Sequence, residues 1–217
     1  MLVSTLCFRI LACAALGYLL GCLNPAVAVG RLKGYDPIRS GSGNPGASNT
    51  VIMAGKAAGL AVALFDIFKA AAACKLGEHL FPELRAALPI AGAGCILGHI
   101  YPVFMRFHGG KGLACLGGVI LACDFRALLL MLAVALVIGL LSNYVCVVTT
   151  SMAAIWPVYY GLVTRFWLGA AIFAIPFVPI LLRHLENFRR IRRGEELHLS
   201  FLWDRSAELR RIGRDEG

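Results

Sequence analysis

Long apolar runs that alternate with short polar stretches are the feature of this chain that most restricts its fold. The runs cover about residues 2–30, 51–74, 86–104, 113–123, 127–141, 145–163 and 167–182. Hydrophobic residues fill 59% of the 217 positions, whereas ordinary soluble domains contain about 45–50%. Because a water-soluble core cannot bury so many separate apolar runs, the pattern predicts an all-α protein with about seven transmembrane helices.

The number seven depends on dividing residues 113–141 into two short spans. A single span there would place Asp124 and Arg126 at the centre of the bilayer, where a charged side chain is costly. Several of the runs are shorter than the roughly 20 residues that a crossing usually needs. An odd number of crossings is favoured because it brings the three polar motifs described below to one face. The pair Asn24-Pro25 is expected to bend the first span.

Basic residues are distributed unevenly between the two sides that this topology defines. The side of the polar motifs carries fourteen, within residues 31–39, 106–111 and 183–217, and the opposite side carries four. Cytoplasmic loops are enriched in Lys and Arg, so the N-terminus is expected outside and the C-terminus in the cytoplasm. The net charge of +9 is explained in this way. We expect no nucleic-acid partner, because the chain contains no recognisable nucleic-acid-binding module.

We expect one membrane domain over residues 1–196 and a basic cytoplasmic tail over residues 197–217. Parts of the tail are amphipathic, so it is expected to lie along the membrane surface. The eight cysteines form no CxxC pair and no Cys/His cluster, so no metal is expected. Asp66 and Lys69 share one face of the second span and are expected to form a neutralised structural pair. A direct catalytic role for this pair is the alternative.

The first polar motif is the loop RSGSGNPGASN at residues 39–49. Its glycines, its proline and its short polar side chains cannot form a packed core. They can form a tight loop whose backbone N–H groups converge on an anion. The residues of this loop that we expect to contact a substrate or its phosphate are Arg39, Gly41, Ser42, Gly43, Asn44, Gly46, Ser48 and Asn49.

Two later motifs are suited to the same task. The stretch HGGKG at residues 108–112 opens the fourth run, where glycines, a helix N-terminus and the charge of Lys111 make a phosphate site. It is not a Walker A loop, because Met105 stands where that loop needs a glycine. The stretch RHLEN at 183–187 closes the seventh run, and its His184 is a natural proton acceptor near neutral pH. Taken singly, HGGKG is a weak signal that a membrane-entry turn would also explain, and RHLEN alone favours a basic membrane-edge helix with a chance histidine. Three such motifs on one face favour an anion site instead.

The three motifs together resemble those of the bacterial acyl-phosphate:glycerol-3-phosphate acyltransferases, the PlsY family. The matching stretches are GSGNPGASN at 41–49, GHIYPVFMRFHGGKG at 98–112 and RHLENFRRIRRGEE at 183–196. The resemblance implies seven spans in the bacterial inner (cytoplasmic) membrane, with the active site on the cytoplasmic face. It implies transfer of a fatty acyl group from acyl phosphate to the 1-hydroxyl of sn-glycerol 3-phosphate. The products would be lysophosphatidate and phosphate, in a first step of phospholipid synthesis.

The same resemblance has implications for cofactors and partners. An acyl phosphate is a mixed anhydride whose phosphate is already a good leaving group, so no cofactor is required. The acyl tail would lie between spans in contact with membrane lipid. Functional coupling to an enzyme that produces acyl phosphate is a further expectation.

The resemblance also implies roles for individual residues. His184 would orient or deprotonate the acceptor hydroxyl, Asn187 would position it, and Ser42 and Lys111 would complete the catalytic set. Substrate and phosphate would be bound by the glycine-rich loops and by neighbouring basic groups, which adds His99, Gly109, Gly110, Gly112 and Arg183 to the residues of the first motif. Structural roles fall to Glu186, Asp66 and Lys69.

Four positions depart from the pattern of the family. Ile52 stands where an arginine is common and Cys146 where a serine is common, while His108 and Cys115 replace a lysine and a threonine. The departures bear on rate and donor choice more than on the fold. They keep open the alternative of a diverged, inactive relative that binds lipid or partner enzymes. A small transporter for a phosphorylated solute is a second alternative, although no internal repeat supports it.

Overall fold

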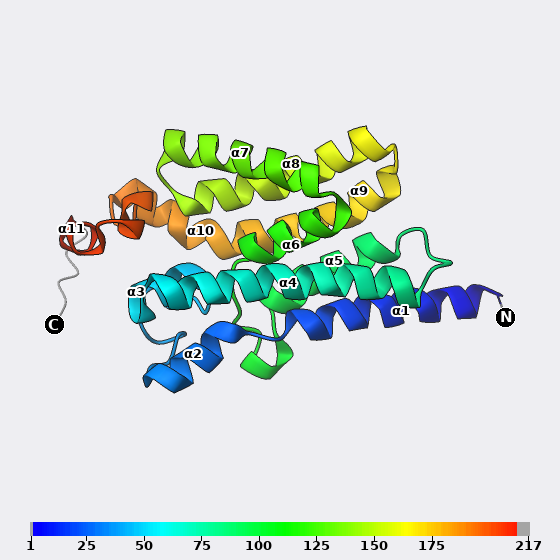
Figure 1. Ribbon diagram of the computed structural model, residues 1–217, viewed down its shortest axis with the longest axis horizontal. Helices are drawn as coiled ribbons and strands as arrows, with labels where there is room; N and C mark the ends of the chain where they lie inside the picture. Colours follow the sequence, from blue (N-terminus) through cyan, green and yellow to red (C-terminus); the bar gives the residue numbers. More distant parts are fainter. Residues whose placement is uncertain (1, 212–217) are drawn as a thin grey trace.

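The computed structural model describes residues 2–211, and helices make up nearly all of its regular structure (Figure 1). The α-helices are α1 (Leu2–Gly21), α2 (Pro25–Lys33), α3 (Ala47–Ala54), α4 (Lys56–Leu80), α5 (Ala87–Ile100), α6 (Leu113–Cys123), α7 (Phe125–Ser142), α8 (Val145–Thr164), α9 (Trp167–Ala174), α10 (Phe177–Arg193) and α11 (Arg205–Arg211). Two short 3₁₀ helices, η1 (Val103–Met105) and η2 (Leu199–Leu202), lie in the connections. The predicted all-α class is confirmed, since the described residues contain no strand.

Six segments of the described chain are long and apolar enough to cross a membrane. They are Val3–Lys33, Lys56–Leu80, Ala87–Met105, Phe125–Ser142, Val145–Thr164 and Trp167–Arg193. The outer faces of these helices are apolar: on α7, Leu129, Leu136 and Leu140 are 52–72% exposed. A row of exposed leucines on a helix that is apolar all round is suited to lipid and not to water. The chain is therefore a multi-pass integral membrane protein.

The helix α6 is the short member of the set. Its 11 residues rise about 16 Å, roughly half the thickness of a bilayer hydrocarbon core. Asp124 ends α6 and caps α7, since its carboxylate accepts hydrogen bonds from the N–H groups of Arg126 and Ala127 at 2.5 and 3.1 Å. The predicted division of residues 113–141 into two helices is thus confirmed. Seven complete crossings remain a prediction, because α6 alone is too short to span the core.

The predicted bend at Asn24-Pro25 is present as a break between α1 and α2. The Asn24 side chain caps α2 by accepting from the N–H groups of Ala26 and Val27, while Pro25 occupies the first helical position, where no N–H is needed. The last apolar run is also broken, because α9 ends before Pro176 and α10 begins after it. Unlike the predicted span, α10 continues to Arg193 and so carries the whole third motif on a helix.

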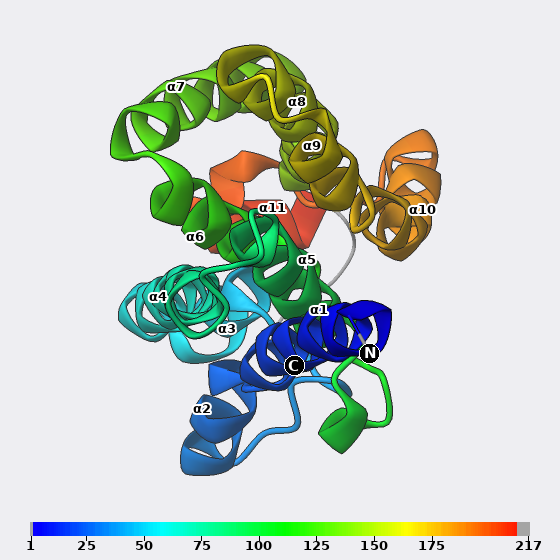
Figure 2. The same cartoon turned by 90° about the vertical axis from the view of Figure 1, so that its right-hand side faces the viewer.

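The helix α5 lies at the centre of the bundle, with α1 and α4 on one side and α9 on the other (Figure 2). Close approach to α1 depends on small residues: a Cβ atom on Gly98 would lie 2.0 Å from the carbonyl oxygen of Tyr18. Such contacts bring membrane helices together, because lipid offers no hydrophobic driving force between them. The main apolar core lies between α4, α5, α6, α8 and α9, and Trp156 is its largest fully buried side chain.

The described part of the predicted tail folds back onto the end of the bundle. α11 and the C-terminal end of α10 gather at one end, and α1 begins at the other (Figure 1). Phe201 in η2 is buried, and Leu199 N–H donates to the carbonyl oxygen of Asn143 at 2.9 Å. The segment therefore packs against the turn between α7 and α8. Residues 212–217 of the predicted tail and residue 1 of the predicted membrane domain lie outside the described residues.

Candidate active site

One asparagine shapes the loop of the first motif from inside. Asn49 is buried, and its side-chain amide donates to the carbonyl oxygens of Pro37 and Ser40 at 3.0 and 3.1 Å. Its Oδ1 accepts from the N–H of Ser42 at 2.8 Å. The Asn24 side chain holds the other end of the loop by donating to Pro45 O at 3.0 Å. Asn49 therefore braces the predicted binding loop, and its amide is fully engaged by backbone.

The glycines of the second motif provide space for the loop that follows α5. The N–H groups of Gly109 and Gly110 donate to the carbonyl oxygens of Ile100 and His99, both at 3.0 Å. A Cβ atom on Gly110 would lie 2.2 Å from His99 Nε2. The N–H groups of Gly109 and Gly110 are therefore already hydrogen-bonded to backbone. The loop can pack on the imidazole ring of His99 only because Gly110 has no side chain. The N–H groups left to face a ligand are those that open α6, which lack helical partners.

Lys111 lies at the start of α6, beside the third motif. Its ammonium donates a hydrogen bond to Asn187 Oδ1. Burial lowers the pKa of Lys111 to about 8; Arg190 and Arg183 lower it as well, while Glu196 opposes them. Gly112, with φ of +93°, is the residue before the helix and takes a conformation that favours glycine. A half-buried cation at a helix N-terminus is a strong site for an anion.

The third motif lies on α10 and is held by contacts on both sides. The Arg183 guanidinium donates to Gly109 O at 2.9 Å, which ties α10 to the glycine loop. His184 is 2% exposed, and its Nδ1 lies 2.7 Å from the carbonyl oxygen of Ile180. Because a carbonyl only accepts, Nδ1 carries the hydrogen, and Nε2 of the neutral ring is the nitrogen with a free lone pair. His184 can therefore accept a proton at Nε2.

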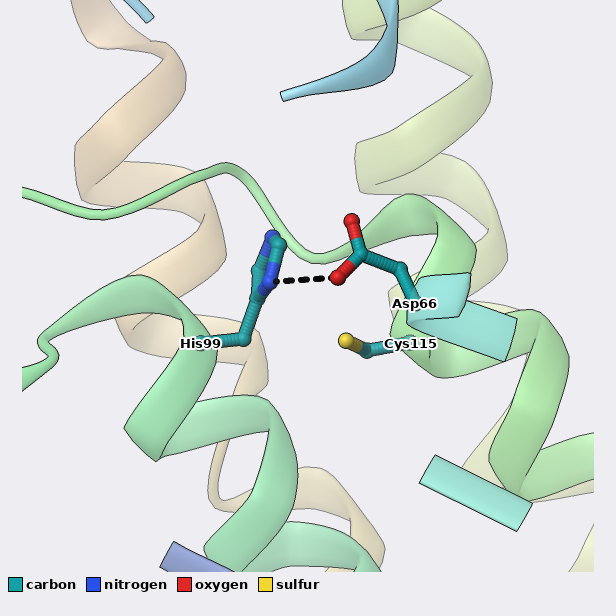
Figure 3. A group of neighbouring side chains, drawn as sticks. All are labelled: Asp66, His99 and Cys115. Atoms are coloured by element: carbon teal, nitrogen blue, oxygen red, sulfur yellow. Dashed lines mark ion pairs between the residues drawn. The ribbon is translucent and has the colours of Figure 1, made fainter. Parts of the chain in front are cut away.

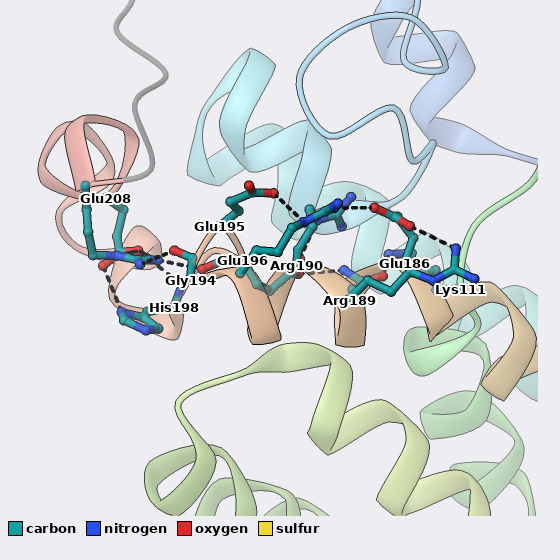
Figure 4. A network of polar contacts seen from close by, with 12 residues as sticks. Lys111, Glu186, Arg189, Arg190, Gly194, Glu195, Glu196, His198 and Glu208 are labelled. Atoms are coloured by element: carbon teal, nitrogen blue, oxygen red, sulfur yellow. Dashed lines mark hydrogen bonds and ion pairs between the residues drawn. The ribbon is translucent and has the colours of Figure 1, made fainter.

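Asn187 is fixed from two directions. Its Oδ1 faces Lys111, and its Nδ2 donates to Glu196 Oε1 at 2.5 Å. The other oxygen of Glu196 accepts from Arg190 Nε at 2.6 Å. Figure 4 shows this network running from Lys111 through α10 toward the tail. Sequence reasoning did not assign roles to Arg190 and Glu196, although both lie in the matched stretch at residues 183–196.

The three motifs surround a single cavity of about 440 Å³. Its polar end is lined by residues of all three motifs and by neighbours of α4 and α5: Ser42, Asn44, Gly46, Ser48, Asp66, His99, Lys111, Gly112, His184, Asn187, Arg190 and Glu196. Its apolar end lies among α6, α7 and α8, and is lined by Leu113, Leu116, Ile120, Leu128, Met131, Leu132, Ala135, Val148 and Met152. The arrangement can hold an amphiphile that has an anionic head and an apolar tail. The apolar lining was missed by sequence reasoning, because apolar residues inside spans carry no distinguishing signal.

Some predicted binding residues do not line the cavity. Gly41 and Gly43 form turns with positive φ, and the side chain of Arg39 is 87% exposed and lies 3.6 Å from Asp36. Glu186 faces away from the cavity and forms ion pairs with Arg189 and Arg193 at 3.3 and 2.9 Å. Gly109, Gly110, Asn49 and Arg183 support the walls as described above.

A buried charged cluster lies beneath the polar end. Asp66, His99 and Cys115 offer ligand atoms that lie within 4.8 Å of one another (Figure 3). The Lys69 ammonium lies 2.6 Å from Asp66 Oδ1 and 3.1 Å from His99 Nδ1. It also donates to Leu23 O at 2.5 Å, at the break between α1 and α2. The Lys69 ammonium therefore connects Asp66 and His99 to the break after α1, and the cluster joins α1, α4 and α5 beneath the glycine loop.

Comparison with known proteins identifies relatives over most of the chain. Residues 11–194 match the family model described as glycerol-3-phosphate acyltransferase. A glycerol-3-phosphate acyltransferase 1 of Oceanobacillus iheyensis is 35% identical over 208 residues, which cover 88% of this chain and 96% of the relative. A glycerol-3-phosphate acyltransferase of Actinobacillus pleuropneumoniae serotype 5b is 38% identical over 182 residues, covering 82% of this chain and 90% of the relative.

Two solved structures share the fold. Both are crystal structures of PlsY (YgiH), an integral membrane glycerol 3-phosphate acyltransferase, one in its glycerol 3-phosphate form and one in its lysophosphatidic acid form. The first aligns with a TM-score of 0.78 at 30% identity and covers 89% of this chain and 96% of that one. The second has a TM-score of 0.75 at 30% identity and covers 87% and 94%. The chain therefore belongs to the glycerol-3-phosphate acyltransferase family of integral membrane proteins, the PlsY family.

Proposed function

We propose that this protein transfers a fatty acyl group from acyl phosphate to the 1-hydroxyl of sn-glycerol 3-phosphate, releasing lysophosphatidate and inorganic phosphate. One observation carries the proposal: a single cavity joins a cationic end at Lys111 to an apolar end between α6, α7 and α8. An amphiphilic donor fits a cavity with these two ends, and a small anionic acceptor fits the cationic end. The relatives named above are glycerol-3-phosphate acyltransferases, which supports the acceptor.

Phosphate recognition is assigned to the start of α6. The Lys111 ammonium, together with the free N–H groups that follow Gly112, would bind one phosphate. Ser42 and Asn44 line the same cavity and would bind the second anionic group. Charge that develops on the acyl oxygen during transfer would be stabilised by the same preorganised donors.

His184 would act as the general base. Its Nδ1–H is held by Ile180 O, which leaves Nε2 to accept the proton of the acceptor hydroxyl. The hydroxyl oxygen then bonds to the acyl carbon while the bond from that carbon to the phosphate oxygen breaks, and the phosphate leaves with the electron pair. Asn187, fixed between Lys111 and Glu196, would position the acceptor beside this base.

The acyl tail would occupy the apolar end of the cavity. Met131 and Met152 line this end, and methionine adapts its shape to irregular apolar ligands. The uneven distribution of basic residues supports an active site on the cytoplasmic face of the bacterial inner membrane. There the enzyme would take acyl phosphate from a partner enzyme that produces it.

The test is an assay of the purified protein in lipid or detergent with acyl phosphate and glycerol 3-phosphate. We expect equal amounts of phosphate and lysophosphatidate, and much slower transfer from acyl-CoA or acyl carrier protein. The Lys111→Ala variant controls for non-enzymatic breakdown of the donor. Faster transfer from a thioester donor would overturn the donor assignment, and the absence of any lysophosphatidate would overturn the reaction.

A further inference from the structure

The segment after α10 lies beyond residues 11–194, which match the family model, yet it packs against the candidate active site. Leu199 N–H donates to Asn143 O at 2.9 Å, and His198 Nε2 lies 3.2 Å from the Tyr144 hydroxyl. Both contacts fix the segment to the turn between α7 and α8. Arg211 closes the segment on itself by donating to the carbonyl oxygens of Gly194 and Glu196 at 3.0 and 2.5 Å. We call residues 195–211 the cap.

A buried carboxylate organises the cap. Glu208 accepts from the His198 N–H at 3.1 Å, from the Ser200 hydroxyl at 2.8 Å and from Arg211 at 2.9 and 3.0 Å. Burial alone would raise the pKa of this carboxyl, but the donors from Arg211, Ser200 and His198 outweigh it and lower the pKa to about 2. Glu208 is therefore ionised under all ordinary conditions, and its charge holds η2 against α11.

The cap forms a wall of the cavity. Leu197 and Phe201 line it together with Lys111 and Asn187, and Phe201 is only 4% exposed. The neighbouring Trp203, in contrast, is 69% exposed. The Phe201 ring thus faces the cavity, and the Trp203 ring faces away from it.

The wall that the cap provides matters for a reactive donor. Water and the acceptor hydroxyl can attack the same acyl carbon. In the first case the water oxygen bonds to that carbon, the bond to phosphate breaks, and a fatty acid and phosphate result. In the second case the acceptor oxygen forms the bond and the acyl group is conserved. Exclusion of water from an active site suppresses such hydrolysis.

We propose that the cap directs the reaction toward transfer and away from hydrolysis, with Phe201 as the residue that determines this specificity and Glu208 as a positioning residue. The inference rests on the proposed function, because it requires a donor that water can cleave. It assigns a role to a segment that lies beyond residues 11–194, which match the family model.

The test compares phosphate released with lysophosphatidate formed at a low concentration of glycerol 3-phosphate. The variants are Phe201→Leu, Phe201→Ala and Glu208→Gln, and Trp203→Ala is the matched control. We expect the excess of phosphate over lysophosphatidate to rise by about threefold or more in Phe201→Ala, because the opened wall admits water. Phe201→Leu should lie between that variant and the wild type, Glu208→Gln should resemble Phe201→Ala, and Trp203→Ala should match the wild type.

Melting temperatures measured on the same samples separate a specificity role from a structural one. A fall in melting temperature with an unchanged ratio of the two products would overturn the proposal. If Phe201→Ala does not fold, Phe201→Leu and Glu208→Gln decide the question by the same ratio. A wild-type protein that forms no lysophosphatidate would count against the proposed function and not against the cap alone.

Discussion

The Lys111 ammonium donates a hydrogen bond to Asn187 Oδ1 across 76 positions of sequence. This bond joins the start of α6 to the middle of α10. It places the cation of the second motif beside the residue expected to position the acceptor. The guanidinium groups of Arg183 and Arg190 lie near this ammonium, and the carboxylate of Glu196 opposes them. Three cationic side chains therefore meet where the second and third motifs come together.

Replacement of Lys111 by alanine should weaken binding of the acceptor. A hydrogen bond to a charged group contributes about 1.5–3 kcal/mol, so the KM for glycerol 3-phosphate should rise by about ten- to a hundredfold. Steady-state kinetics measure this change. Lys111→Arg keeps the charge and should retain more of the affinity. Unchanged kinetics in Lys111→Ala would remove this residue from the site.

The pH dependence should reveal the lowered pKa of Lys111. Below its pKa of about 8 the side chain is cationic and binds phosphate; above that value the charge is lost. We therefore expect kcat/KM for glycerol 3-phosphate to fall as the pH rises through about 8, since this parameter reports the free enzyme. Lys111→Arg should remove the fall, because arginine stays protonated. A decline that persists in that variant would assign the titration to another group.

Replacement of His184 by glutamine should affect kcat. General base catalysis contributes about 10²–10⁴-fold, so kcat should fall within that range while KM changes little. The matched control is His108→Gln, because His108 is exposed and interacts with Arg106 O of its own loop. Equal losses in the two variants would contradict the assignment of the base.

Lys69 should be needed for stability. Its removal would leave Asp66 as an uncompensated buried charge, and breaking a buried pair costs about 3–5 kcal/mol. We expect Lys69→Met to lower the free energy of unfolding by about that amount in denaturant titrations in detergent. The control is Lys75→Met on the same helix, whose pair with Glu78 is exposed and should contribute less than about 1 kcal/mol. Similar values for both variants would show that the buried pair has no special role.

Cys146 should limit the rate of the enzyme. It lines the cavity at a position where the family resemblance implies serine, and a hydroxyl donates a stronger hydrogen bond than a thiol. One such bond contributes about 0.5–1.5 kcal/mol, so Cys146→Ser should raise kcat/KM by about two- to tenfold. Cys7→Ser, at an exposed position, serves as the control. A lower kcat/KM in Cys146→Ser than in the wild type would show that the thiol is adapted to this site.

The elements of this protein follow largely from local chemistry in the sequence. Asp124 interrupts an apolar run and offers an oxygen to two N–H groups, so the helix boundary is readable from one residue. Asn24-Pro25 and Pro176 mark breaks for the same local reason. The three motifs could be found because glycine-rich or basic polar stretches adjoin the apolar runs, and because the predicted topology brings all three to one face.

Tertiary structure decided which residues of those motifs face the cavity. The sequence by itself indicated a membrane helix bundle with three anion-binding motifs, because hydropathy and residue type are properties of short stretches. It did not indicate that the Asn49 side chain braces its own loop, that the N–H groups of Gly109 and Gly110 donate to α5, or that Phe201 lines the cavity. Those outcomes depend on contacts between positions far apart in the chain, and only the packed helices determine which donors and surfaces remain free.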